Sequence, residues 1–125
     1  MLSYNFSMEF FVSKSFKTIT QDISLALTPF RKEAAAPMAG FDAMARSAMA
    51  EGVLSALNKE LIATAIAVAT RCDGCIGFHV RALVRMGATR EQINEMLAVT
   101  VYMGGGPSLM YAAEVLRAFD EFQPA

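Results

Sequence analysis

The chain has 125 residues, of which 54% are hydrophobic and only 18% are charged. This length predicts a single domain, residues 1–125, with room for a substantial core. The formal net charge of −1, without a basic cluster, argues against nucleic acid as a partner. The apolar excess in so small a domain predicts that part of its surface is covered in a homo-oligomer.

No stretch of the sequence predicts a membrane span. The longest apolar run, Leu61 to Ala69, is too short to cross a bilayer and is interrupted by Thr64. Residues 1–12 lack a basic leader and contain Glu9, so they do not predict a signal peptide. We therefore expect a cytoplasmic protein, in which a cysteine pair is typically catalytic or metal-binding rather than a structural disulfide.

The first part of the chain predicts an arm followed by helices. Residues 1–18 carry no clear pattern and are expected to form an N-terminal arm or a short strand. Pro29 is expected to divide a helical stretch into two pieces, and Pro37 to open another helix that ends near Gly52. The apolar positions at helical spacing are Ile19, Ile23, Leu27 and Phe30 in the first stretch, and Met38, Phe41, Ala45, Ala48 and Met49 in the second.

Two helices are predicted in the middle of the chain. The first covers about residues 58–71 and is apolar nearly all round after Glu60, which is typical of a buried central helix. The second begins at the segment Cys72–Cys75, with Asp73 as its cap, and stops at Gly87.

The last two helices are predicted from their ends. Residues 89–92 (Thr-Arg-Glu-Gln) form a capping-box pattern, and residues 104–107 (Gly-Gly-Gly-Pro) separate the two helices. No hairpin signal or internal repeat is present, so the sequence predicts an all-α fold, a compact bundle of about six helices. The positions expected to face inward are Ile93, Met96, Leu97 and Val101, then Leu109, Ala112, Ala113, Leu116 and Phe119.

Cys72, Cys75 and His79 are the candidate reactive residues. They comprise both cysteines and the only histidine, and on a helix their spacing of three and four places them on one face. Two thiols within disulfide reach and an imidazole beside one of them are the parts of a redox dithiol site. Cys75, nearer to the imidazole, is the expected nucleophile, although in thioredoxin-like CxxC sites the first cysteine has that role.

Two other interpretations fit the same residues. Free cysteines are often inert parts of a core. Alternatively, the two thiols, His79 and a carboxylate could hold zinc. A structural zinc site usually draws a second Cys or His pair from another segment, and this chain has none left. The supply of residues therefore favours a redox dithiol.

Glu60 is the fourth candidate, at the head of the apolar helix and twelve residues before Cys72. It is either a first-turn carboxylate favoured by the helix dipole or a buried carboxylate that hydrogen-bonds His79 and orients it as a base. In the second case a carboxylate–imidazole–thiol chain would take the proton from Cys75.

These residues resemble a known family. Glu60, residues 71–79, residues 86–89 and residues 104–107 are similar to the AhpD-like alkylhydroperoxidase proteins of the carboxymuconolactone decarboxylase superfamily. The likeness spans roughly residues 54–113. It implies an all-helical fold that commonly assembles as trimers or hexamers.

The resemblance also implies roles for the four candidates. Cys75 would attack a peroxide and become a sulfenic acid, and Cys72 would resolve it to a disulfide. His79 would relay protons and Glu60 would support His79. The reductant would be a dithiol, sometimes a lipoyl group on a partner protein, and neither a metal nor an organic cofactor is implied. The family's prototype has a second histidine of the relay where this chain has Gly74.

The sequence thus favours a thiol–disulfide oxidoreductase of the alkylhydroperoxidase type, a peroxidase. The alternatives are a non-catalytic oligomeric metal-binding or scaffold protein and a carboxymuconolactone decarboxylase-like enzyme. The decarboxylase branch acts on a lactone acid without needing the cysteine pair. Its acid substrate would need an anion site, but Arg71, Arg81 and Arg85 are interpreted as isolated, solvated charges on helix faces.

Overall fold

A computed structural model describes residues 14–125, and within them the chain forms six helices and no strand. The all-α prediction is therefore confirmed for this part of the chain. The expected arm lies mostly outside the described residues, and its last three residues, 16–18, already belong to the first helix described. In chain order the helices are α2 (Phe16–Glu33), α3 (Ala35–Met49), α4 (Ala56–Ala69), α5 (Asp73–Arg85), α6 (Arg90–Gly104) and α7 (Gly106–Phe122).

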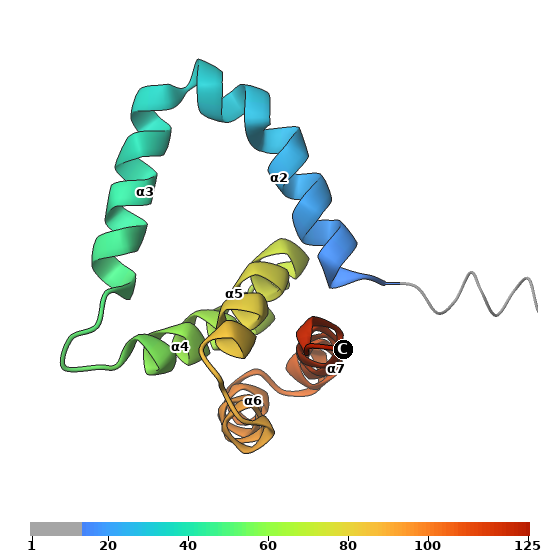
Figure 1. Ribbon diagram of the computed structural model, residues 1–125. Coiled ribbons are helices and arrows are strands. Elements are labelled where there is room, and N and C mark those ends of the chain that lie inside the picture. The colour runs from blue at the N-terminus through green and yellow to red at the C-terminus, as the bar shows by residue number, and fades with distance from the viewer. Residues whose placement is uncertain (1–13) are drawn as a thin grey trace, which may run out of the picture.

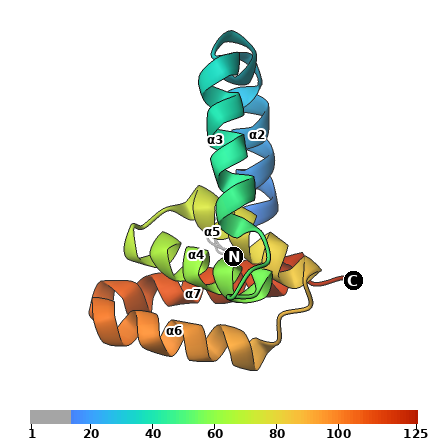
Figure 2. The ribbon, with the colours of Figure 1, turned by 90° about the vertical axis from the view of Figure 1, so that its left-hand side faces the viewer.

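The helices divide into a compact body and a projecting hairpin. Helices α4 to α7 pack against one another and form the body, whereas α2 and α3 extend away from it as a helical hairpin (Figure 1). Seen from the side, the α2–α3 hairpin stands upright on the body (Figure 2). Only the N-terminal end of α2 is buried, through Phe16 and Thr20, and α3 buries no residue.

Helix α5 lies at the centre of the molecule, in contact with α2, α4 and α7. The sequence predicted that α4, the helix before α5, would be the buried central helix, and this prediction is wrong for the single chain. Helix α4 is covered mainly by α5, α6 and α7 on one side. Its side chains Ile62 and Ile66 remain 48% and 57% exposed. The largest fully buried apolar side chains are Phe16, Val68, Ile76, Val80, Leu83, Ile93 and Val115.

Local sequence signals set most helix ends. The Ser55 hydroxyl accepts the Asn58 N–H and caps α4. The predicted capping box is confirmed at α6, where Thr89 and Gln92 satisfy each other's backbone N–H groups. Gly87, at a φ of +81°, follows α5, and Gly105, at +71°, separates α6 from α7. Both angles fall in the left-handed region that glycine adopts readily.

The predicted division at Pro29 is wrong. Helix α2 continues through Pro29 to Glu33, and the chain turns at Ala34 instead. A proline removes one helical hydrogen bond, which leaves the carbonyl of Leu25 without its partner. Because Leu25 and Pro29 are both exposed, water can solvate that carbonyl. The helix therefore tolerates the proline.

The buried face of α7 also differs from the predicted one. Ala112 and Phe119 are buried as expected, but Leu109 is 52% exposed. Ser108 and Val115 are buried in its place. Helix α7 has apolar residues on two faces, so helical spacing alone could not choose between them. Within the described residues, no helix is both long and apolar enough to cross a membrane.

Candidate active site

Cys72 and Cys75 form a disulfide at the start of α5, with their Cα atoms 5.2 Å apart. The helix begins at Asp73, and its cap is Cys72 rather than the predicted Asp73. Cys72 has an extended backbone, so its Sγ turns back and accepts the Cys75 N–H at 3.1 Å. Both sulfurs therefore lie at the positive end of the helix dipole, which favours a thiolate once the bond is reduced.

Asp73, between the two cysteines, is anchored by an ion pair. Its carboxylate lies 2.9 Å from the Lys14 ammonium, which also lies 3.1 Å from the Glu114 carboxylate on α7. Burial alone would lower the pKa of Lys14, but the hydrogen bonds and negative charges of Asp73 and Glu114 outweigh it and raise that pKa. Lys14 thus joins the entry of α2, the start of α5 and α7.

The structure brings Glu60 and His79 together from adjacent helices. The His79 Nδ1 donates to the Glu60 Oε2 at 2.7 Å. Glu60 is 9% exposed and lies in the second turn of α4, because that helix begins at Ala56, earlier than predicted. The first-turn interpretation of Glu60 is therefore wrong, and its carboxylate is the one that holds the imidazole.

His79 lies one helical turn beyond Cys75 on α5. With its Nδ1 proton directed at Glu60, the neutral ring keeps its lone pair on Nε2, which is then free to take a proton. The histidine side chain is 34% exposed and Cys75 is exposed, so small molecules can reach this part of α5. An acid–base side chain and a disulfide thus lie about one helical turn apart on an accessible part of α5.

The position of the prototype's second histidine is covered by a side chain of α2. A Cβ atom added to Gly74 would come 2.7 Å from the Ile23 Cδ1. A histidine at residue 74 would therefore displace Ile23. In this chain Ile23 of α2 therefore lies against the backbone between the two cysteines.

Arg71 is a residue whose role the sequence interpretation missed. It is not a solvated charge on a helix face but stands in the turn between α4 and α5, with a φ of 59°. Its guanidinium donates to the Val68 carbonyl at 2.6 Å and to the Ser108 Oγ at 3.2 Å. The guanidinium carbon also lies 5.3 Å from the centre of the Tyr111 ring. The only sequence signal for this role was the position of Arg71 at the end of a predicted helix, where a basic side chain can bind the last carbonyl groups of that helix.

Neither thiol is available as a metal ligand in this oxidised form, because both sulfurs are in the disulfide. Within residues 14–125, no group of three or more His, Cys, Asp or Glu side chains is arranged to hold a metal ion.

Residues 35–118, which include all four candidates, match the carboxymuconolactone decarboxylase family. The chain belongs to this family. Family membership agrees with the AhpD-like resemblance, because those proteins are part of the same superfamily.

Related proteins extend over most of the chain. An uncharacterized protein from Cupriavidus necator is 40% identical over 109 residues, which are 82% of this chain and 96% of that protein. The "Uncharacterized protein 4 in cox locus" of Paracoccus denitrificans is 39% identical over 85 residues, 68% of this chain and 77% of that protein.

A solved structure shares the fold. The crystal structure of an apo carboxymuconolactone decarboxylase family protein from Legionella pneumophila is 54% identical in sequence and superposes with a TM-score of 0.87. The match covers 90% of this chain and all of that one. The fold of the family member therefore includes the hairpin as well as the body.

Proposed function

We propose that this protein is a thiol–disulfide oxidoreductase of the alkylhydroperoxidase type that reduces peroxides through Cys75 and Cys72. The observation that carries the proposal is the disulfide at the start of α5, one turn before a histidine bound to a buried carboxylate. A disulfide is the oxidised end state of such a cycle. Family membership is compatible with this activity.

The cycle begins with the reduced pair. His79 accepts the proton of Cys75 at its Nε2, and the thiolate attacks one oxygen of the peroxide. The O–O bond breaks, the alcohol leaves with the proton from His79, and Cys75 becomes a sulfenic acid. Cys72 then attacks the Cys75 sulfur, water leaves, and the disulfide forms. The peroxide has gained the two electrons that the cysteine pair has lost.

An external dithiol completes the cycle, either a small dithiol or a lipoyl-type group on a partner protein. It attacks the Cys72–Cys75 disulfide, returns both thiols to the protein and leaves as its own disulfide. The exposure of Cys75 supports attack from outside the chain. Such reductants are kept reduced in the cytoplasm, which is where we place the protein.

We also propose a homo-oligomer, a trimer or a hexamer. The support is the apolar surface left exposed on the α2–α3 hairpin and on α4. This surface includes Leu25, Phe30, Phe41, Met44, Ile62 and Ile66. Monomeric proteins rarely expose so much apolar surface, because burying it against another copy is favourable.

Peroxide consumption by the reduced protein, with several dithiol donors, tests the proposed activity. The wild-type protein should turn over, Cys75→Ser should not react, and Cys72→Ser should react once and stop at a sulfenic acid or mixed disulfide. No consumption with any peroxide and donor pair would contradict the proposal. Stoichiometric zinc in the purified, reduced protein would instead favour the metal-binding alternative.

Brief treatment with iodoacetamide followed by mass spectrometry tests the division of labour. We expect the label first on Cys75, because His79 lies one turn away from it. A label found mainly on Cys72 would reverse the assignment and remove His79 as the working base.

A further inference from the structure

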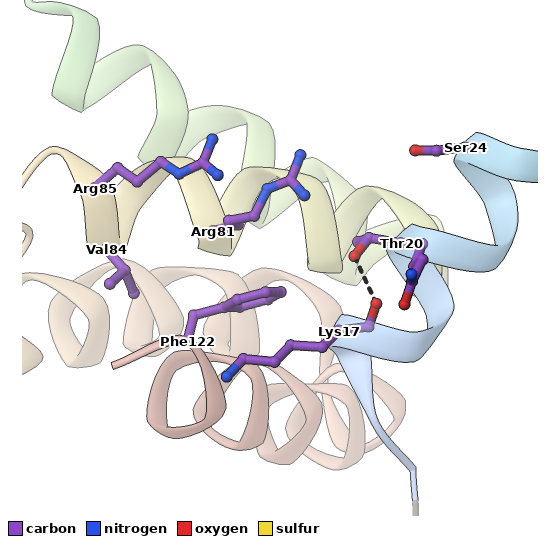
Figure 3. A pocket seen from close by; sticks show the side chains of 8 residues that line it. Lys17, Thr20, Ser24, Arg81, Val84, Arg85 and Phe122 are labelled. Carbon is purple, nitrogen blue, oxygen red and sulfur yellow. Dashed lines mark hydrogen bonds between the residues drawn. The ribbon is translucent and has the colours of Figure 1, made fainter. Parts of the chain in front are cut away.

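A cavity of about 510 Å³ lies between α2, α5 and the end of α7. One face of α2 and one face of α5 form its walls, and Figure 3 shows the side chains that line it. Three of them are cations, Lys17, Arg81 and Arg85, and none is a carboxylate. The structure thus brings together arginines that the sequence interpretation treated as isolated.

Arg81 and Arg85 lack an ion pair with any carboxylate among residues 14–125. They stand one turn apart on α5 and project from the same side of the helix (Figure 3). Like charges at this spacing are slightly unfavourable in a helix. Lys17 is partly balanced, since its positive charge contributes to a lowered pKa of Glu121. The two arginines therefore carry most of the uncompensated charge.

One of the arginines is oriented by an aromatic ring. The guanidinium carbon of Arg81 lies 5.1 Å from the centre of the Phe78 ring. A guanidinium held over a ring keeps the N–H groups along its edge free for an anion. Val84 and Phe122 add apolar surface to the cavity, and Ser24 adds a hydroxyl at its rim. The cavity thus offers charge, donors and an apolar wall.

We infer that this cavity binds a small organic dianion, of which a phosphate monoester is the best fit. Arginine forks bind phosphate oxygens in pairs, and a doubly charged group balances two guanidinium groups. The body of the ester would lie against Val84 and Phe122. The volume is typical of cavities that hold small molecules. By helical spacing, residues 81 and 85 lie on the other side of α5 from His79, so this site is separate from the disulfide.

Calorimetric titration of the full chain with phenyl phosphate tests the inference. We expect saturable binding that weakens about tenfold or more in Arg81→Gln and in Arg85→Gln, because each removes a charge-assisted hydrogen-bond donor. Inorganic phosphate should bind more weakly than phenyl phosphate, since it lacks the ring that contacts Phe122. Circular dichroism of each variant verifies that the helices are intact.

The matched control is Arg46→Gln, which removes the same charge from an exposed position of α3 outside the cavity. An equal loss of binding in this control would show a general charge effect and overturn the site. The absence of saturable binding of phenyl phosphate by the wild-type chain would overturn it as well. Tighter binding of glutarate than of phenyl phosphate would overturn the assignment of a phosphate ester. Because the measurement is binding, a negative result leaves the peroxidase proposal standing.

Discussion

The body and the α2–α3 hairpin are equally helical but differ in what their helices bury. In the body, α5 buries Ile76, Gly77, Val80 and Leu83, whereas α3 of the hairpin buries nothing. Phe16 at the root of the hairpin is fully buried and Phe41 in α3 is 55% exposed. Apolar periodicity therefore predicted an apolar face on α3 without revealing whether another element covers it.

The difference has an energetic consequence. Most of the stability of a helix in a protein comes from packing its apolar face, and this holds for α2 and α3, of 18 and 15 residues. The body supplies its own packing, since its helices cover one another. The hairpin packs against the body mainly at the N-terminal end of α2, where Phe16 and Thr20 are buried and Ile19 and Ile23 lie against the body. We therefore expect its exposed apolar face to need a second copy of the chain, which is what the proposed oligomer supplies.

The largest expected effect lies in the body. We expect the Glu60–His79 pair to activate the Cys75 thiol. His79→Gln should then slow alkylation of Cys75 near neutral pH by about 100-fold, a rate factor typical of a general base. Glu60→Gln should slow it less, because the imidazole remains but loses the carboxylate that orients it. Timed iodoacetamide labelling of the reduced protein measures both.

The control for this experiment is Ser47→Ala in the exposed part of α3, which should label at the wild-type rate. Unchanged labelling in His79→Gln would show that the helix terminus alone activates the thiol.

The next largest effect is expected in the hairpin. Replacing Phe41 and Met44 together by Ser removes exposed apolar side chains, 55% and 62% accessible, from one side of α3. If these side chains pack against another copy, light scattering should show the mass falling toward the 13.5 kDa of one chain. Arg46→Gln, on the same helix, should keep the wild-type mass. A wild-type chain that is monomeric at micromolar concentration would contradict the proposed oligomer.

A smaller effect is expected where the hairpin joins the body. A Cβ atom at Gly77 would come 2.6 Å from the Cγ2 of Thr20, which is buried in the interface between α5 and α2. Gly77→Ala should therefore destabilise the protein by about 2 kcal/mol, as overpacking does, despite the better helix propensity of alanine.

The double variant Gly77→Ala, Thr20→Ser should recover most of this loss, because serine lacks the clashing methyl group but keeps the hydroxyl that bonds the Phe16 carbonyl. Denaturant unfolding measures all three variants. Equal stability of the single and double variants would show that the clash lies elsewhere.

The smallest effect concerns the anchor of α2 on α7. Glu121 accepts the Ser15 hydroxyl at 2.6 Å and the Phe16 N–H at 2.7 Å. Burial by itself would raise the pKa of Glu121. The two hydrogen bonds, a third from the Lys17 N–H and the Lys17 charge outweigh burial, so the pKa lies below its ordinary value of 4.5. Glu121→Gln should lower the free energy of unfolding by about 1 kcal/mol at neutral pH, which is the typical net contribution of one hydrogen bond.

The sign of the pH dependence follows from the lowered pKa. The contribution of Glu121 is complete above its ordinary value of 4.5 and is lost as the pH falls through the lower value in the folded state. The wild-type protein and Glu121→Gln should therefore become equally stable in acid. Urea unfolding at several pH values measures this, and a difference that persists at the acid end would contradict it.

Local signals in the sequence predicted the start of α6 at its capping box and a break between α6 and α7 within residues 104–107, where the structure has Gly105. They also predicted Cys72, Cys75 and His79 as one cluster, because all three are close along α5. The contact of Glu60 with His79 was only one of two interpretations. These residues are nineteen apart in the chain, and helical spacing within one helix cannot reach across to another.

By itself the sequence determined that the chain is helical and that Cys72, Cys75 and His79 lie close together, since both depend on neighbours a few residues away along the chain. The tertiary structure decided which apolar faces became core, with Val115 buried on α7 and Leu109 left exposed. It also decided that Arg71 would bind the end of α4, while Arg81 and Arg85 meet Lys17 around a cavity. These outcomes depend on how α2, α5 and α7 pack, because residues far apart in sequence meet only when their helices are in contact.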